Sequence, residues 1–223
     1  MSTVPSRGHD VIILARYLVY MMNENLLRLS IRNILLEDSA IDPVLLGTVN
    51  DKTAFVFGPK AKKFLADSGL TPEEVGYVID RLNNMNLDRF NKYDSDFIRA
   101  GRKFGLKPST LKAMAIEETT LGKALINAAG STAAGIIQIT KPTLDTFNKN
   151  LPKDIKYDYD VLTSDPAKSI EIAAHYIDHF LIKGRGLKDR TAILSAYKTG
   201  PDSANYVKRV NAFKKFVDIV DKI

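Results

Sequence analysis

Apolar residues recur at helical spacing along almost the whole chain, and this pattern most limits the folds that the sequence can adopt. In the last segment the apolar positions share one stripe, made of Tyr206, Val210, Phe213, Phe216–Val217 and Val220. Positions three or four residues apart lie on one face of an α-helix. Strand patterns are few, with residues 53–57 the best candidate and residues 136–140 a weaker one. The sequence therefore predicts an all-α, mainly helical protein.

Helix starts can be placed from their capping residues. Residues 71–74, Thr-Pro-Glu-Glu, form a capping box in which Thr71 is the N-cap and Glu74 the third helical residue. Pro108 precedes one apolar helical run, and residues 164–166, Ser-Asp-Pro, precede another. We expect a helix to begin at each of these places.

Polar, turn-prone segments near residue 90 interrupt the helical pattern and suggest a boundary between two domains. Residues 83–86 and 91–93 are polar and turn-prone. We expect a small helical N-terminal domain at residues 1–90 and a catalytic domain at residues 91–223. In the first, residues 47–53, 61–65 and 69–70 faintly resemble small helical peptidoglycan-binding modules, and a structural or partner-docking role is the alternative. The basic excess behind the net charge of +6 lies in the second region. It would suit an anionic polymer, such as peptidoglycan, teichoic acid or nucleic acid, but a merely solvated basic surface is an equal interpretation.

Two residue types are missing, and both absences restrict the chemistry. The chain has no cysteine, so disulfides, cysteine-based zinc sites and thiol nucleophiles are excluded. It also has no tryptophan, so stacking against a sugar ring must use Tyr or Phe. His175 and His179 stand four apart on a predicted helix, but no third metal ligand accompanies them, and we expect neither metal nor cofactor.

The N-terminus lacks the pattern of a secretory signal. Its apolar stretch at residues 11–15 is short and is interrupted by Arg16. No apolar run approaches the roughly 18 residues that a membrane-spanning helix needs. We therefore expect no stable membrane insertion and synthesis in the cytoplasm.

The most informative pattern is an acidic pair, Glu117-Glu118, at the end of the apolar helical run 113–116. A small-residue turn at residues 130–135 follows, and then Gln138 within an apolar stretch. A carboxyl group that protonates a glycosidic oxygen near neutral pH needs burial to raise its pKa. A pair of ordinary helix-end charges is the competing interpretation. Gln138 would contact either a sugar or its own backbone.

Several short motifs in order resemble the lytic transglycosylase and goose-type lysozyme family. That family carries Glu-Ser, Gly-Leu-Met-Gln, Pro-x-Thr, Ala-Tyr-Asn-x-Gly-Pro and Tyr-Val-x-x-Val. The matching segments here are residues 118–119, 135–138, 141–143, 196–201 and 206–210. The resemblance covers about residues 94–216 and implies a lysozyme-like catalytic domain.

The resemblance also implies a substrate, a mechanism and a set of site residues. The substrate would be a peptidoglycan glycan strand, cut at the β-1,4 bond between N-acetylmuramic acid and N-acetylglucosamine. Glu118 would be the general acid and base, giving a 1,6-anhydro product or simple hydrolysis. The substrate-binding residues would be Ser131, Gly135, Gln138, Thr143 and Tyr197. Glu117 stays open as the alternative acid.

Two departures from the family pattern and one spacing matter. Lys198 replaces the family Asn, and Thr119 replaces Ser. Lys198 keeps open a lysozyme-fold structural or wall-binding protein without catalysis, and another β-1,4 glycan as substrate is also open. The Glu-to-Gly spacing is closer to phage lysozymes, which predicts an endolysin or a virion-associated enzyme. We expect a monomer that reaches the cell wall through a holin lesion or inside a phage particle, and we expect no nucleic-acid partner.

Overall fold

The computed structural model describes residues 41, 43–126 and 131–221. From Pro43 onward these residues belong to one compact unit, Asp42–Ile223. The position near residue 90 lies inside this unit, and most of residues 1–41 lies outside the described residues. The division into domains 1–90 and 91–223, and a wall-binding role for the first, stay predictions.

The first part of this unit is a strand pair followed by helices. Its elements are η1 (Pro43–Leu45), β1 (Leu46–Val49), β2 (Lys52–Phe55), α3 (Pro59–Asp67), α4 (Pro72–Leu82) and α5 (Leu87–Asn91). The strands are antiparallel, with Leu46 opposite Phe55 and Val49 opposite Lys52. The predicted strand at 53–57 is thus confirmed for its first three residues.

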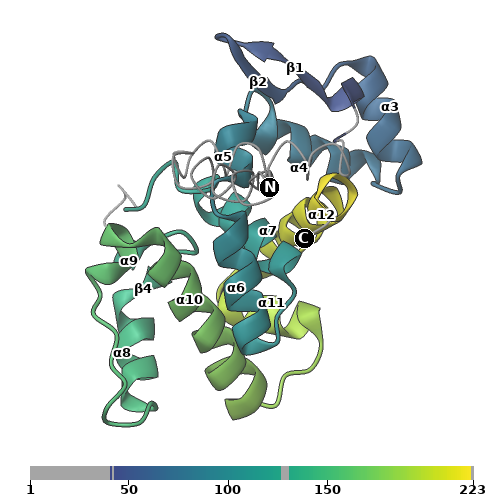
Figure 1. Cartoon of the computed structure of the whole chain (residues 1–223). Helices are drawn as coiled ribbons and strands as arrows, with labels where there is room; N and C mark the ends of the chain where they lie inside the picture. The colour runs from purple at the N-terminus through teal and green to yellow at the C-terminus, as the bar shows by residue number, and fades with distance from the viewer. Residues whose placement is uncertain (1–40, 42, 127–130, 222–223) are drawn as a thin grey trace, which may run out of the picture. The chain divides into compact units, whose positions relative to one another are not determined.

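The second part is almost entirely helical. Its elements are α6 (Asp94–Phe104), α7 (Pro108–Thr119), β3 (Ala133–Ala134), β4 (Ile139–Thr140), α8 (Lys141–Lys149), α9 (Val161–Ser164), α10 (Pro166–Tyr176), the π-helical η2 (Ile177–Gly184), α11 (Arg190–Tyr197) and α12 (Ser203–Val220). Figure 1 shows α7 in the middle of this unit, where it packs against α6 and α12. Residues on all sides of α7 are buried, as expected of a helix without a polar face. The mainly helical fold class is confirmed.

The predicted helix starts are confirmed. Thr71 caps α4: its hydroxyl accepts from the Glu74 N–H at 3.3 Å, and its own N–H donates to the Glu74 carboxylate at 2.9 Å. Asp165 caps α10 by accepting from the Lys168 N–H at 2.9 Å. Pro108 is the first residue of α7. Every apolar position of the C-terminal stripe is buried in α12.

Residues 43–91 share a core with α12. Phe55 contacts Phe90 edge-on at 4.9 Å and Phe216 at 5.3 Å between ring centroids. All three rings are fully buried. Helix α4 also packs along α12. Because burying a Phe side chain is worth about 2 kcal/mol, the first part of the unit stabilises the helix that closes the second.

A buried lysine joins α7 to the start of α6 and to the residue that follows α12. Lys112 is fully buried, and its ammonium lies 2.8 Å from Asp94, next to Asp221, and 3.7 Å from the Phe90 ring centroid. A buried charge is tolerated only with such partners. The pKa of Asp221 is raised by burial, although the Lys112 charge opposes that effect.

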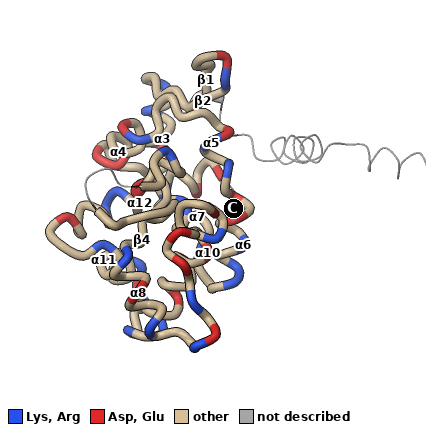
Figure 2. Tube along the Cα trace, turned by 90° about the vertical axis from the view of Figure 1, so that its left-hand side faces the viewer, with Lys and Arg blue, Asp and Glu red and all other residues tan. Residues whose placement is uncertain are grey.

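Charged residues are interspersed over the described unit. Figure 2 shows basic and acidic residues scattered over the unit, and many form ion pairs, such as Lys103 with Glu171 at 2.7 Å. None of the described helices is long and apolar enough to span a membrane.

The weaker strand prediction at residues 136–140 is wrong for its first part. Residues 135–138 form a tight turn, with φ of 84° at Gly135 and 51° at Gln138. Only Ile139–Thr140 is a strand, β4, which pairs antiparallel with β3. A left-handed φ is incompatible with an extended strand, so the glycine overrides the β-propensity of its isoleucine neighbours.

Candidate active site

Helix α7 ends abruptly, directly after the acidic pair. Thr120, Leu121 and Gly122 have φ of 52°, 57° and 80°. Left-handed backbone costs a non-glycine residue roughly 1–2 kcal/mol, so this reversal is held by its surroundings. Strain of this kind is concentrated at functional sites.

The Thr119 side chain ties the helix end to the turn at residues 135–138. Its hydroxyl lies 2.8 Å from the Ile136 carbonyl and 3.2 Å from the Ala115 carbonyl, and it accepts from the Gly122 N–H at 2.9 Å. Thr119 is buried. A hydroxyl at this position thus connects the first family motif to the second.

Gly135 is buried where a side chain has no room. A Cβ there would lie 2.2 Å from the Ser169 hydroxyl and 2.8 Å from the Leu162 carbonyl. Its N–H donates to the Leu125 carbonyl at 2.9 Å. Ser169 also accepts from the Ile136 N–H at 3.1 Å. Gly135 therefore lets the turn pack directly on α9 and α10, and a contact with substrate stays a prediction.

Gln138 makes the internal contact that the sequence left open. Its amide nitrogen donates to the Gly135 carbonyl at 2.9 Å and to the Leu125 carbonyl at 3.3 Å. The side chain is half-buried and holds the turn closed. A further contact with sugar stays a prediction.

Tyr197 connects the motif at residues 196–201 to the turn at residues 135–138, so that this motif is the third to be joined to the others, after 118–119 and 135–138. Its hydroxyl donates to the Ile137 carbonyl at 2.6 Å, rather than to a carboxyl group. Burial, and then the charge of Glu118, raise the pKa of Tyr197 well above its ordinary value. The hydroxyl therefore remains protonated and keeps this hydrogen bond.

Ser131 and Thr143 lie at the surface or near it. The exposed Ser131 accepts from the Ala133 N–H at 3.0 Å. Thr143 is in the first turn of α8, with its hydroxyl 2.8 Å from that of Thr140. Substrate binding by either residue stays a prediction.

Glu118 faces side chains from the end of α11 and the start of α12. Its side chain is 8% exposed, and the ammonium of Lys198 lies 3.7 Å from its carboxylate. Burial raises the pKa of Glu118 above its ordinary value; Lys198 opposes this, and the charge of Glu117 adds to it. The buried hydroxyl of Tyr206 also favours the charged carboxyl, but without a hydrogen bond of standard geometry to any described residue. Glu118 is thus a nearly enclosed carboxyl group that holds its proton to a higher pH than usual.

Glu117 is equally buried, with 8% of its side chain exposed, but its charged partners differ. Its two oxygens lie 2.7 Å from Arg209 Nε and 3.2 Å from an Arg81 terminal nitrogen. Arg209 also binds Asp202 at 2.8 Å. Two guanidinium groups therefore hold Glu117, while Glu118 pairs with the single ammonium of Lys198 at 3.7 Å.

The comparison with protein families decides the classification. The Transglycosylase SLT domain model matches residues 95–219, which include all three connected motifs. The chain belongs to this family. It is a lytic transglycosylase, an enzyme that acts on the glycosidic bonds of peptidoglycan. No curated protein matches the sequence.

Two residues that contact Glu117 in this transglycosylase, Arg81 and Arg209, were not predicted from the sequence. Arg209 is an unspecified position of the motif at residues 206–210, but it follows Tyr206 by three positions and therefore shares its face of α12. Arg81 lies in α4, before the matched domain begins. No spacing or motif links Arg81 to Glu117, because only the packing of α4 on α12 brings them together.

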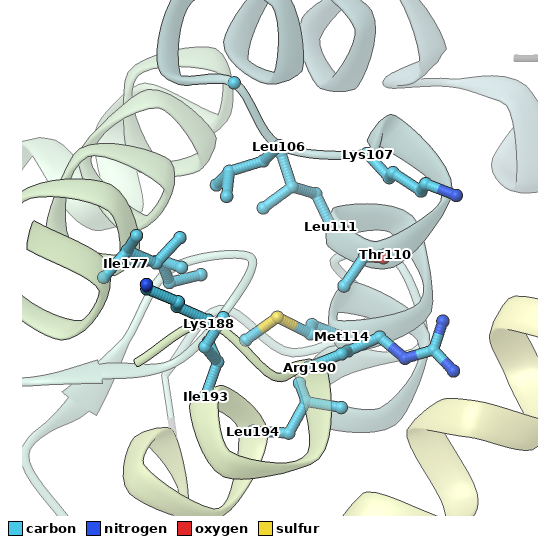
Figure 3. A pocket seen from close by; sticks show the side chains of 12 residues that line it. Leu106, Lys107, Thr110, Leu111, Met114, Ile177, Lys188, Arg190, Ile193 and Leu194 are labelled. Atoms are coloured by element: carbon cyan, nitrogen blue, oxygen red, sulfur yellow. The ribbon is translucent and has the colours of Figure 1, made fainter. Parts of the chain in front are cut away.

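Two other features lie outside this carboxyl site. An apolar pocket of about 280 Å³ is formed by the start of α7 with η2 and α11 (Figure 3), and Met114, one turn before Glu118, lines it. His175 and His179 belong to an aromatic cluster: the His175 ring stacks on Phe104 at 4.9 Å, and its Nδ1 lies 2.8 Å from the Tyr157 hydroxyl. Residues 43–126 and 131–221 contain no group of three side chains that could hold a metal ion.

Proposed function

We propose that Glu118 is the general acid and base that cleaves the β-1,4 bond between N-acetylmuramic acid and N-acetylglucosamine. The observation that carries this proposal is the contrast within the acidic pair. Both side chains are 8% exposed, but the pKa of Glu118 is raised, whereas Glu117 is held by Arg81 and Arg209. A carboxyl group with a raised pKa can deliver a proton near neutral pH.

The proposed reaction needs one carboxyl group and no water. Protonated Glu118 donates its proton to the glycosidic oxygen as the bond from that oxygen to the muramoyl anomeric carbon breaks. The resulting carboxylate then takes the proton of the muramoyl 6-hydroxyl, whose oxygen bonds to the anomeric carbon. The product is a 1,6-anhydro ring, and Glu118 regains its proton.

The surroundings of Glu118 support a mechanism with one carboxyl group. Glycosidases with two catalytic carboxylates separate them by about 5 Å or by roughly 6.5–9.5 Å, and both must be free to act. The carboxylate next to Glu118 in the sequence is Glu117, and both of its oxygens are occupied by guanidinium groups. Asp202, near the third motif, is bound to Arg209.

Mass spectrometry of fragments released from purified peptidoglycan tests the product. We expect fragments that end in 1,6-anhydromuramic acid, because the 6-hydroxyl is part of the substrate and outcompetes water in an enclosed site. Fragments with reducing ends would instead show that water attacks, and this part of the proposal would fail. If well-folded protein released fragments of neither kind, the assignment of the bond would be contradicted.

Lys198 provides a test of the proposed acid through the pH profile. In Lys198→Asn the ammonium that lowers the pKa of Glu118 is gone, so that pKa should rise further. Because the acid must be protonated to act, the high-pH limb of the activity profile should move to higher pH. Rates of fragment release across a pH series measure it. If that limb stayed in place or moved to lower pH, the role of Glu118 would be contradicted.

We also propose that this transglycosylase is a phage endolysin or virion-associated enzyme that acts on the bacterial wall after leaving the cytoplasm. The support is the Glu-to-Gly spacing of 118 and 135. Cells expressing the protein should lyse promptly only when a holin is also produced. Equally rapid lysis without any membrane lesion would contradict delivery by that route.

A further inference from the structure

One guanidinium group contacts residues on both sides of Glu118. Arg81 donates through one terminal nitrogen to Glu117 at 3.2 Å and through the other to the Thr120 hydroxyl at 3.4 Å. It comes from α4, outside the matched domain at residues 95–219. The element that supplies Arg81 is therefore separate in sequence from the three motifs but in direct contact with the end of the catalytic helix.

Arg209 completes the hold on Glu117 from the other side. Its Nε donates to Glu117 at 2.7 Å, and its Nη2 donates to Asp202 at 2.8 Å. The Glu117 side chain is 8% exposed. Successive residues of an α-helix point about 100° apart, so fixing Glu117 also fixes the direction in which Glu118 leaves the helix.

The same contacts control the charge beside Glu118. The groups that face Glu118 are Glu117 on its own helix, Tyr197 and Lys198 at the end of α11, and Tyr206 on α12. The charge of Glu117 raises the pKa of Glu118, and the guanidinium groups offset part of that charge. Glu117, Arg81 and Arg209 also line a pocket of about 500 Å³. The other charged or phenolic side chains of that pocket are Tyr77, Asp80 and Lys123.

We propose that Arg81 is a positioning residue for Glu118, which makes α4 part of the catalytic apparatus although the family domain begins after it. Arg81 sets the orientation of the last turn of α7 and compensates the neighbouring carboxylate. The proposal rests on the proposed role of Glu118. It extends that role to a segment that sequence comparison leaves outside the domain.

The test compares Arg81→Gln with a matched variant of the full chain. Lys215→Gln is the control, because Lys215 binds Glu74 of α4 at 2.7 and 2.8 Å, across the same α4–α12 contact but away from Glu117. Arg81→Gln should lower the rate at saturating peptidoglycan by about three- to tenfold, as expected when a catalytic group loses its orientation, with the substrate concentration at half-maximal rate little changed. Lys215→Gln should lose a similar amount of thermal stability and keep its rate.

The pH profile separates positioning from a merely structural role. Removing Arg81 leaves the Glu117 charge less compensated, so the pKa of Glu118 should rise and the high-pH limb should move upward. Glu117→Gln removes the repelling charge, so the same limb should move downward. Arg81→Lys should restore part of the rate, since it restores the charge but not the two-pronged contact.

The outcomes are distinguishable from those of the proposed function. If Glu118→Gln is inactive while Arg81→Gln matches Lys215→Gln in rate and pH profile, the inference about Arg81 is overturned and the role of Glu118 stands. If Glu118→Gln keeps its activity, the proposed function fails first, and the positioning role fails with it. Movement of the limb in the same direction for Arg81→Gln and Glu117→Gln would also overturn the inference.

Discussion

Replacing Glu118 with glutamine should lower the rate of fragment release from peptidoglycan by about 10³-fold or more. General acid and base catalysis contributes roughly 10²- to 10⁴-fold, and here one carboxyl group is proposed to serve both steps. Glutamine keeps the size of the side chain but cannot donate an acidic proton. The measurement is the rate of release of soluble fragments, with the folded state checked by circular dichroism and thermal unfolding.

Glu171→Gln is the matched control for this experiment. Glu171 is a partly buried carboxylate that binds Lys103 at 2.7 Å and Lys168 at 3.1 Å, and it lies in α10 outside the proposed machinery. This variant should keep the wild-type rate within about twofold, because a surface ion pair is worth only roughly 0–1 kcal/mol. If Glu118→Gln retained more than about a tenth of the wild-type rate, another group would have to supply the proton.

Gly135→Ala should destabilise the folded protein by about 3 kcal/mol or more. Gly135 has a φ of 84°, and an added Cβ would meet the Leu162 carbonyl at 2.8 Å and the Ser169 hydroxyl at 2.2 Å. The left-handed backbone alone costs alanine roughly 1–2 kcal/mol, and overpacking a buried site costs a further 1–3 kcal/mol or so. The free energy of unfolding is measured by urea denaturation.

Gly69→Ala separates these two contributions. Gly69 has a φ of 94°, and a Cβ there would meet no atom within 4 Å. It should therefore show only the backbone cost of about 1 kcal/mol. If both variants lost the same stability, the close packing of Gly135 on α9 and α10 would have no energetic weight, and the turn would tolerate small side chains.

Much of the local structure follows from the sequence because its causes are local. The capping box at Thr71, the prolines that begin α7 and α10, and the apolar stripe of α12 each depend on residues within a few turns of one another. The order of the five short motifs predicted the family that the matched domain shows. The turn at residues 135–138 was less predictable, because the left-handed φ of Gly135 outweighs the β-propensity of Ile136 and Ile137.

The sequence by itself determined the helical fold class, the family and an acidic pair in which either carboxylate was open as the acid. Only the tertiary structure separated the two members of that pair. Arg81 and Arg209 reach Glu117 from positions 36 and 92 residues away in the chain. Glu118 instead faces Tyr197, Lys198 and Tyr206. The difference is physical: helix formation and capping depend on near neighbours, whereas burial and charge compensation depend on residues that only packing brings together.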